Sequence, residues 1–145
     1  MVPTLWGRLQ TRMVLLAVVG GLVTAGLAPV LPVAAPVADR YRAAFVVLAA
    51  VAILGPGWEL IYQFLMQWRW EKDWPTLFGL LTLVPEGGLI WWANRAGALP
   101  GLPTPVPPLA FAVDFLAVWL AVWATANGPL RVVCLRWRFH GGRFL

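Results

Sequence analysis

Long stretches without a charged residue are the feature that most constrains this chain. Residues 13–38 hold no acidic or basic side chain and are dominated by Ala, Val, Leu and Gly. A helix of about 20 such residues crosses the roughly 30 Å hydrocarbon core of a bilayer, at about 1.5 Å per residue. The segment therefore predicts a membrane-spanning helix.

A cleaved secretory signal peptide is the alternative for this first segment. Small residues from Val33 to Ala38 resemble a cleavage site, but the apolar region of a signal peptide is typically about 7–15 residues long. We therefore expect a retained span. Because proline interrupts a helix, this span should end near Pro29, Pro32 and Pro36.

Three further apolar segments follow. The second is broken by Gly55-Pro56-Gly57, and the third by Pro85-Glu86-Gly87-Gly88, so the third helix should be bent or discontinuous. Five prolines between residues 96 and 108 predict a stiff, extended loop before the last span. The expected fold is an all-α integral membrane protein with a four-transmembrane-helix bundle. It comprises a cytoplasmic N-terminus (1–12), a membrane domain (13–130) with spans at about 13–36, 43–66, 75–94 and 109–127, and a basic tail (131–145).

Composition supports the membrane assignment. The chain is 61% hydrophobic and 12% charged, against roughly 45–50% and about 25% in soluble domains. Its net charge of +5 comes from cations beside apolar segments, which favours anionic lipid headgroups over nucleic acid as partners. The single cysteine, Cys134, excludes an intramolecular disulfide. Abundant Ala, Gly, Pro and Trp, with one lysine against ten arginines, suggest a bacterial origin.

Orientation follows from the distribution of Lys and Arg, which are enriched in short cytoplasmic loops. With the N-terminus inside, eight of the eleven fall on the cytoplasmic side, and only Arg40, Arg42 and Arg95 fall outside. We therefore expect a multi-pass protein of the cell membrane with both termini in the cytoplasm. The alternative is three spans plus an interfacial helix from Trp58 to Trp74, with the C-terminus outside.

The tail alternates apolar and cationic positions before a Gly-Gly pair, which is typical of a short hairpin. One face would be apolar and the other basic, so the tail could lie on anionic headgroups or dock on a neighbouring subunit. The lone histidine, His140, is not expected to bind a metal. The candidate contacts are Arg131, Arg136, Arg138, Arg143 and Trp137.

Three acidic residues fall inside predicted spans, where each costs on the order of 3 kcal/mol. Glu86 and Asp114 should lie at similar depth and could share a proton, whereas Glu59 lies nearer the cytoplasm. No Lys or Arg falls inside a predicted span, so protonation, a bound cation or a partner chain should neutralise them. The candidate polar site comprises Glu59, Glu86, Asp114, Tyr62, Gln63 and Thr82.

Helical periodicity assigns the faces of these spans. A ridge of small residues, Ala17, Gly21 and Ala25, should turn inward on the first span and allow close helix packing. Trp119 and Trp123 lie opposite the stripe of Asp114, and should face lipid or a partner.

Two functions remain open. The first is a small multi-pass membrane protein that acts as a non-catalytic accessory or oligomeric subunit of a membrane complex, with the acids fixing helix packing. The alternative is a proton- or cation-coupled transporter or channel subunit that uses the acids. No catalytic constellation, metal motif or cofactor motif stands out, so we expect no enzyme activity, metal or cofactor.

Overall fold

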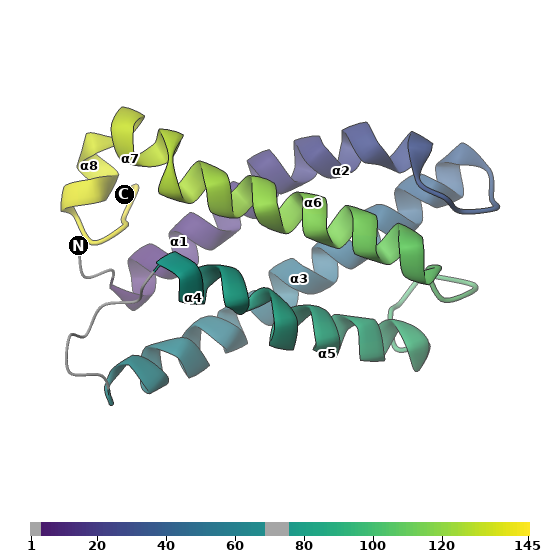
Figure 1. The fold of residues 1–145 in the computed structure, drawn as a ribbon, viewed down its shortest axis with the longest axis horizontal. Coiled ribbons are helices and arrows are strands. Elements are labelled where there is room, and N and C mark those ends of the chain that lie inside the picture. The colour runs from purple at the N-terminus through teal and green to yellow at the C-terminus, as the bar shows by residue number, and fades with distance from the viewer. Residues whose placement is uncertain (1–3, 69–75) are drawn as a thin grey trace.

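The computed structural model describes residues 4–68 and 76–145, and these form an all-helical fold, as expected (Figure 1). No strand occurs in these two ranges. The helices are α1 (Leu5–Leu15), a π-helical turn η1 (Leu16–Gly20), α2 (Gly21–Leu27), a 3₁₀ turn η2 (Ala28–Val30), α3 (Val37–Met66), α4 (Thr76–Leu81), α5 (Leu83–Arg95), α6 (Pro108–Asn127), α7 (Pro129–Val133) and α8 (Leu135–Phe139).

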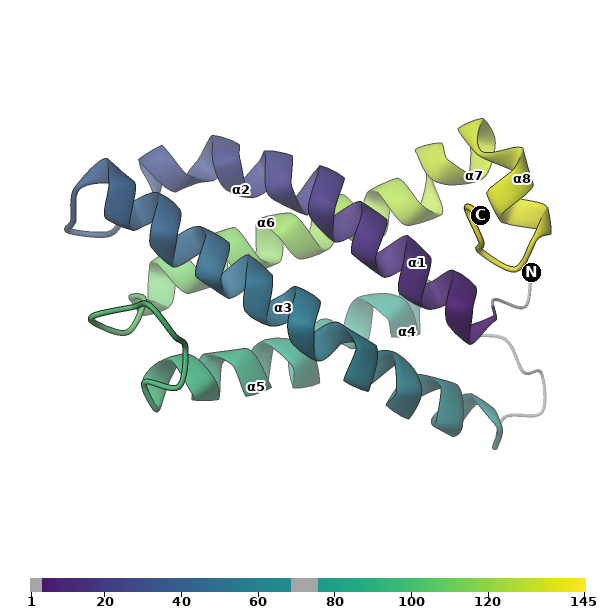
Figure 2. The same cartoon turned by 180° about the vertical axis from the view of Figure 1, so that it is seen from behind.

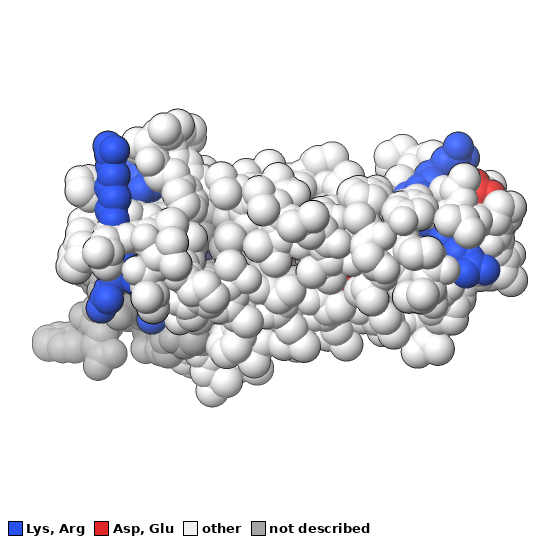
Figure 3. Space-filling view, turned by 90° about the horizontal axis from the view of Figure 1, so that it is seen from above, with Lys and Arg blue, Asp and Glu red and all other residues white. Residues whose placement is uncertain are grey.

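Three helical segments are long and apolar enough to cross a membrane: Leu5–Val30, Val37–Met66 and Pro108–Val133. Large hydrophobic side chains remain exposed along them, including Leu22 and Ile53. Figure 3 shows the charged residues of one face at the two ends of the molecule, with an almost uncharged belt between them. This distribution is the one expected of a protein whose middle lies in hydrocarbon.

The helical segments α1–α2, α3, α4–α5 and α6 run along the long axis of the molecule (Figures 1 and 2). The two ends of the chain lie together at one end of the molecule, where the amide of Thr4 donates to the carbonyl of Gly141 at 3.0 Å. The connections at residues 31–36 and 96–107 lie at the opposite end.

The first helix begins earlier than expected, at Leu5 rather than at Met13. Thr4 caps it by accepting a hydrogen bond from the amide of Gly7 at 3.1 Å. Arg8 and Arg12, which marked the expected boundary of the span, therefore lie inside the helix. The helix ends near Pro29 as predicted, and Arg40 donates to the carbonyls of Pro29 and Ala35 at 2.9 and 3.0 Å.

Helix α3 runs without interruption through Pro56, so the expected break at Gly55-Pro56-Gly57 is wrong. A proline removes one backbone hydrogen bond, but neighbouring helices hold a membrane helix in place across it. Residues 58–66 belong to this same helix. The proposed separate interfacial helix from Trp58 to Trp74 therefore does not begin at Trp58, and its residues 69–74 lie outside the described ranges.

The third apolar segment is discontinuous, as predicted, but the interruption lies at Thr82, between α4 and α5, and the expected position at Pro85-Glu86-Gly87-Gly88 is wrong because these residues lie inside α5. Pro85 lies in the first turn of α5 and has no N–H for the carbonyl of Leu81. The hydroxyl of Thr82 donates to the carbonyl of Gly79 at 2.9 Å, which favours a turn at this point. The predicted start of this span at Pro75 lies outside the described residues.

The first helical segment contributes to the core through the face that carries Gly20, Thr24 and Ala28, which are all buried. Gly20 lies against Leu48 of α3 and Val118 of α6. The ridge of Ala17, Gly21 and Ala25 was expected inside, but it lies beside this face, and Gly21 faces open space. The two ridges are one position apart and similar in residue size, so sequence periodicity did not separate them.

The proline-rich segment between α5 and α6 is extended, as predicted, and a buried asparagine holds it. Asn94 is 1% exposed; its amide nitrogen donates to the carbonyl of Val106 at 3.0 Å, and its oxygen accepts from the amide of Val106 at 2.9 Å. Both backbone groups of a buried loop residue are thereby satisfied.

The tail forms two short helices, α7 and α8, and the expected hairpin is wrong. Gly141 and Gly142 have positive φ angles of 63° and 83°, and they turn the chain back onto α1. A Cβ atom at Gly7 would lie 2.0 Å from the carbonyl oxygen of Gly141. The tail therefore docks on the N-terminal helix, and such a long-range contact has no signal in local periodicity.

Candidate functional site

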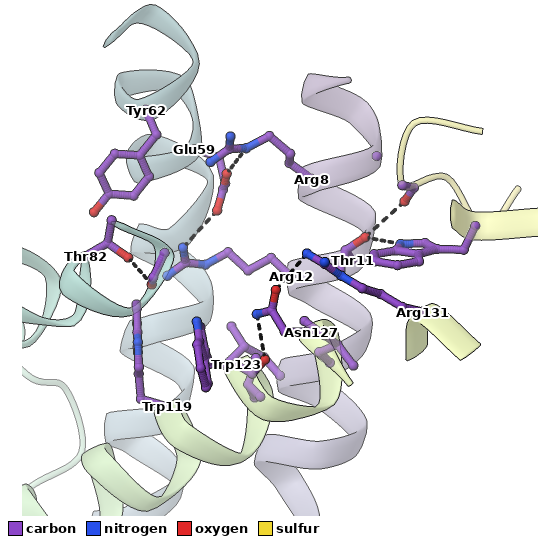
Figure 4. A pocket seen from close by; sticks show the side chains of 18 residues that line it. Arg8, Thr11, Arg12, Glu59, Tyr62, Thr82, Trp119, Trp123, Asn127 and Arg131 are labelled. Atoms are coloured by element: carbon purple, nitrogen blue, oxygen red, sulfur yellow. Dashed lines mark hydrogen bonds and ion pairs between the residues drawn. The ribbon is translucent and has the colours of Figure 1, made fainter. Parts of the chain in front are cut away.

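Glu59 and Glu86 form one ionic cluster with two arginines of α1. Glu59 on α3 accepts hydrogen bonds from Nε of Arg8 at 2.6 Å and from Nη1 of Arg12 at 3.1 Å. The side chains of Arg8 and Glu59 are 13% and 11% exposed, so the pair is largely shielded from solvent. Figure 4 shows Arg8 and Arg12 extending from α1 toward Glu59.

Arg12 also reaches Glu86, and so bridges the two carboxylates. Its Nη1 donates to Oε1 of Glu86 at 3.2 Å, and its Nη2 donates to Oε2 of the same residue. The hydroxyl of Tyr62 adds a hydrogen bond to Oε1 of Glu86 at 3.1 Å. One planar guanidinium thereby ties α1 to both α3 and α5, in the two-pronged geometry that arginine makes with carboxylates.

A glycine and a tryptophan shape the path of Arg12. A Cβ atom at Gly55 would lie 2.3 Å from Nε of Arg12, so any larger residue there would displace the guanidinium. On another side, Cζ of Arg12 lies 5.8 Å from the centre of the Trp119 ring, within the range of a cation–π contact. Trp119 therefore faces the interior rather than lipid, which corrects the expectation from helical periodicity.

The expectation that the acids lack an arginine of the same chain is wrong. It treated Arg8 and Arg12 as residues outside the span, whereas α1 includes both and carries them at positions i and i+4, on one face. Because Arg8 and Arg12 directly precede the apolar segment, the sequence could have indicated that they extend its helix. The expected pairing of Glu86 with Asp114 is also wrong, because Glu86 shares Arg12 with Glu59.

Asp114 lies apart from this cluster. It is 3% exposed on α6, and in the described ranges no cation lies within salt-bridge distance. Thr24 of α2 is also a buried polar residue, with 0% exposure. Sequence reasoning missed Thr24 because threonine is common in apolar helices.

The two remaining candidates of the polar site differ in position. Thr82 lines a cavity beside Glu59 and Tyr62, whereas Gln63 does not line it. The side-chain oxygen of Gln63 is buried without a hydrogen-bond partner in the part of the chain that the structure describes. The structure therefore brings Glu59, Glu86, Tyr62 and Thr82 together, and leaves Asp114 outside.

A cavity of about 270 Å³ lies against this cluster, between the helices of the end that holds both termini. Its polar lining includes Arg8, Arg12 and Glu59 of the cluster, and its aromatic lining includes Trp119 and Trp123, as Figure 4 shows. Trp123 was expected to face lipid or a partner, and it also belongs to this lining. Further lining residues come from α4, from α7 and from the tail, namely Gly79, Arg131, Trp137 and Gly142.

The candidate contact residues of the tail have different positions. Nε1 of Trp137 donates to the hydroxyl of Thr11 at 2.7 Å, so this tryptophan is buried within the chain itself. Nε of Arg143 donates to the hydroxyl of Thr4 at 3.2 Å. The other three arginines, Arg131 on α7 and Arg136 and Arg138 on α8, are exposed. Of these three, only Arg131 lines the cavity.

No three His, Cys, Asp or Glu residues gather into a possible metal site in residues 4–68 and 76–145. The chemistry that this arrangement supports is charge pairing and the binding of a ligand beside it. Comparison with known proteins adds no relative: no family model, no curated protein and no solved structure matches this chain.

Proposed function

We propose that this chain is a four-span protein of the cell membrane, with both termini in the cytoplasm, that serves as a non-catalytic accessory or oligomeric subunit. The observation that carries the proposal is the pairing of Glu59 and Glu86 with Arg8 and Arg12. Carboxylates held by two arginines of the same bundle fix the relative positions of the helices, and they are poorly suited to taking up and releasing a cation.

The lengths of the helical segments support four crossings. Helices α4 and α5 together span residues 76–95 and run alongside the three longer segments. About 20 helical residues are enough for one crossing of the hydrocarbon core. An even number of crossings also agrees with the position of both chain ends at one end of the molecule.

The outer surface supports association with another membrane chain. The ridge of Ala17, Gly21 and Ala25 is not covered by the core, and a Cβ atom at Gly21 would meet nothing within 4 Å. Small residues on a membrane helix let a second helix approach closely. The tail adds exposed apolar residues beside its cations, including Val133 and Phe139, which suits contact with anionic headgroups or with a subunit.

Particle mass in mild detergent tests association. The proposal expects a particle larger than the 15.9 kDa monomer plus its detergent. Gly21→Leu should reduce the particle to the monomer, because the side chain blocks close approach. Gly26→Leu is the matched control, since Gly26 also faces open space and lies on a different side of α2. A monomeric wild-type protein that binds no other membrane chain would refute the proposal.

The second candidate is a proton- or cation-coupled transporter or channel subunit. The cavity that lies directly against Glu59 favours it, because an ion would need such a path to the carboxylate. Proteoliposomes with an imposed pH gradient separate the two candidates. The accessory role predicts the same gradient decay with wild type and with Glu59→Gln, whereas transport predicts decay that only the wild type accelerates.

A further inference from the structure

The cavity near the chain ends has two kinds of wall. One carries the guanidinium groups of Arg8, Arg12 and Arg131, and the other carries the indole rings of Trp119 and Trp123 (Figure 4). Binding sites for small molecules combine an apolar lining with a few polar groups that fix orientation. A ligand that suits both walls has a charged group and an apolar body.

The sign of that charge follows from the residues of the cluster. Arg8, Arg12 and Arg131 line the cavity, and Arg8 and Arg12 pair with the carboxylates of Glu59, in the lining, and of Glu86 behind it. Three cations against two anions leave one positive charge. A single anionic group in the cavity would therefore neutralise the set, and a cation would add to its charge.

Donors for such an anion remain available. Arg131 forms no ion pair with a described residue, and its Nη2 donates only to the amide oxygen of Asn127 at 2.8 Å. Arg8 uses Nε for Glu59 and Nη1 for the sulfur of Met66, and its Nη2 has no partner in the described part of the chain. Arginine carries five N–H donors, so both side chains can bind a further acceptor.

The level of the cavity along the molecule indicates where the ligand comes from. Some of its lining residues come from α7, from the tail and from the start of α1. These segments form one charged end of the molecule, next to the uncharged belt. In a bilayer this boundary lies at the headgroups, where tryptophan is also enriched. A lipid presents its phosphate at this depth and its acyl chains toward the belt.

We propose that this cavity binds the phosphate headgroup of an anionic membrane lipid, with the phosphate between Arg8 and Arg131 and the apolar part along Trp119 and Trp123. Phosphate accepts strong, charge-assisted hydrogen bonds from arginine. The basic surface of α8 is a different feature, since Arg136 and Arg138 are exposed and outside the cavity. The inference holds whether or not the chain is a subunit of a larger assembly.

Native mass spectrometry of the full chain, released from nanodiscs of phosphatidylcholine and phosphatidylglycerol, tests this inference. One phosphatidylglycerol should stay bound per chain in preference to phosphatidylcholine. Arg131→Gln should lower this retention about tenfold, since a hydrogen bond to a charged group contributes about 1.5 kcal/mol or more. Ala126→Trp should abolish retention by filling the cavity, because Ala126 belongs to its lining.

Arg136→Gln is the matched control, because it removes the same charge from the same end of the molecule, outside the cavity. Its retention of phosphatidylglycerol should equal that of the wild type. Circular dichroism establishes that each variant keeps its helix content. Equal loss in Arg131→Gln and Arg136→Gln would overturn the inference in favour of general surface attraction. Displacement of the lipid by millimolar inorganic phosphate would overturn it in favour of a soluble phosphate ligand.

Discussion

At the scale of single residues, Arg12 is the cation that both acids of the cluster share. It joins Glu59 and Glu86 and lies beside the ring of Trp119. A buried ion pair is not a strong source of net stability, because removing two charges from water costs nearly what their attraction returns. Loss of one partner is different, because the other charge then stays buried and unpaired.

Arg12→Met should therefore destabilise the protein strongly, by about 3–5 kcal/mol. Glu86, which is 1% exposed, would lose its cationic partner, whereas Glu59 would keep Arg8. The double variant Arg12→Met, Glu86→Met should recover much of that loss, since no unpaired charge remains. Denaturant unfolding in detergent measures each free energy of unfolding. A double variant no more stable than Arg12→Met alone would contradict this account of the cluster.

At the scale of elements, the tail packs closely on α1 because glycines at the contact have no side chains to keep the two backbones apart. Gly7 lies so close to the backbone of Gly141 that a Cβ atom at Gly7 has no room, and a Cβ atom at Gly141 would meet the side chain of Thr4 at 3.0 Å. Hydrogen bonds from Thr11 to the carbonyl of Gly142 at 3.0 Å and from Trp137 to Thr11 complete the contact. The two chain ends thereby form one unit.

Gly7→Ala should release the tail, because the new methyl group would overlap the carbonyl oxygen of Gly141. The loss of a few hydrogen bonds of about 1 kcal/mol each predicts a cost of about 1–3 kcal/mol. Trypsin should then cut after the tail arginines several-fold faster than in the wild type. Gly26→Ala is the control, since Gly26 has open space around it, and alanine favours a helix. Unchanged cleavage in Gly7→Ala would show that this contact does not hold the tail.

At the scale of the whole molecule, the position of both ends at one pole predicts an even number of crossings. The excess of Lys and Arg among the residues assigned to this end predicts that it lies in the cytoplasm. Cys134, the single cysteine, lies in the tail between α7 and α8, so it reports on the side occupied by the C-terminus.

A membrane-impermeant maleimide should not label Cys134 in intact cells, and should label it after permeabilisation. In a Cys134→Ser background, Arg42→Cys should show the opposite behaviour, because Arg42 lies near the other end, at the start of α3. Labelling of Cys134 in intact cells would favour the three-span alternative, with the C-terminus outside.

Much of this architecture follows from local rules. Apolar segments must be helical in hydrocarbon, because each backbone N–H and C=O needs a partner within its own segment. Proline acts through the same rule, which is why the end of the first helix near Pro29 and the existence of an interruption in the third segment were predictable, although its position at Thr82 was not. The all-helical class and the extended proline-rich loop were predictable from local rules as well.

The sequence by itself thus determined which segments are helical and apolar, since those properties depend on near neighbours in the chain. Only the tertiary structure decided that Arg12 bridges Glu59 and Glu86, that the ridge of Gly20 rather than that of Gly21 faces inward, and that the tail returns to Gly7. Each of these contacts joins residues far apart in the chain. Their formation depends on the rotation and depth of whole helices, and a shift of one residue between helices would change every partner.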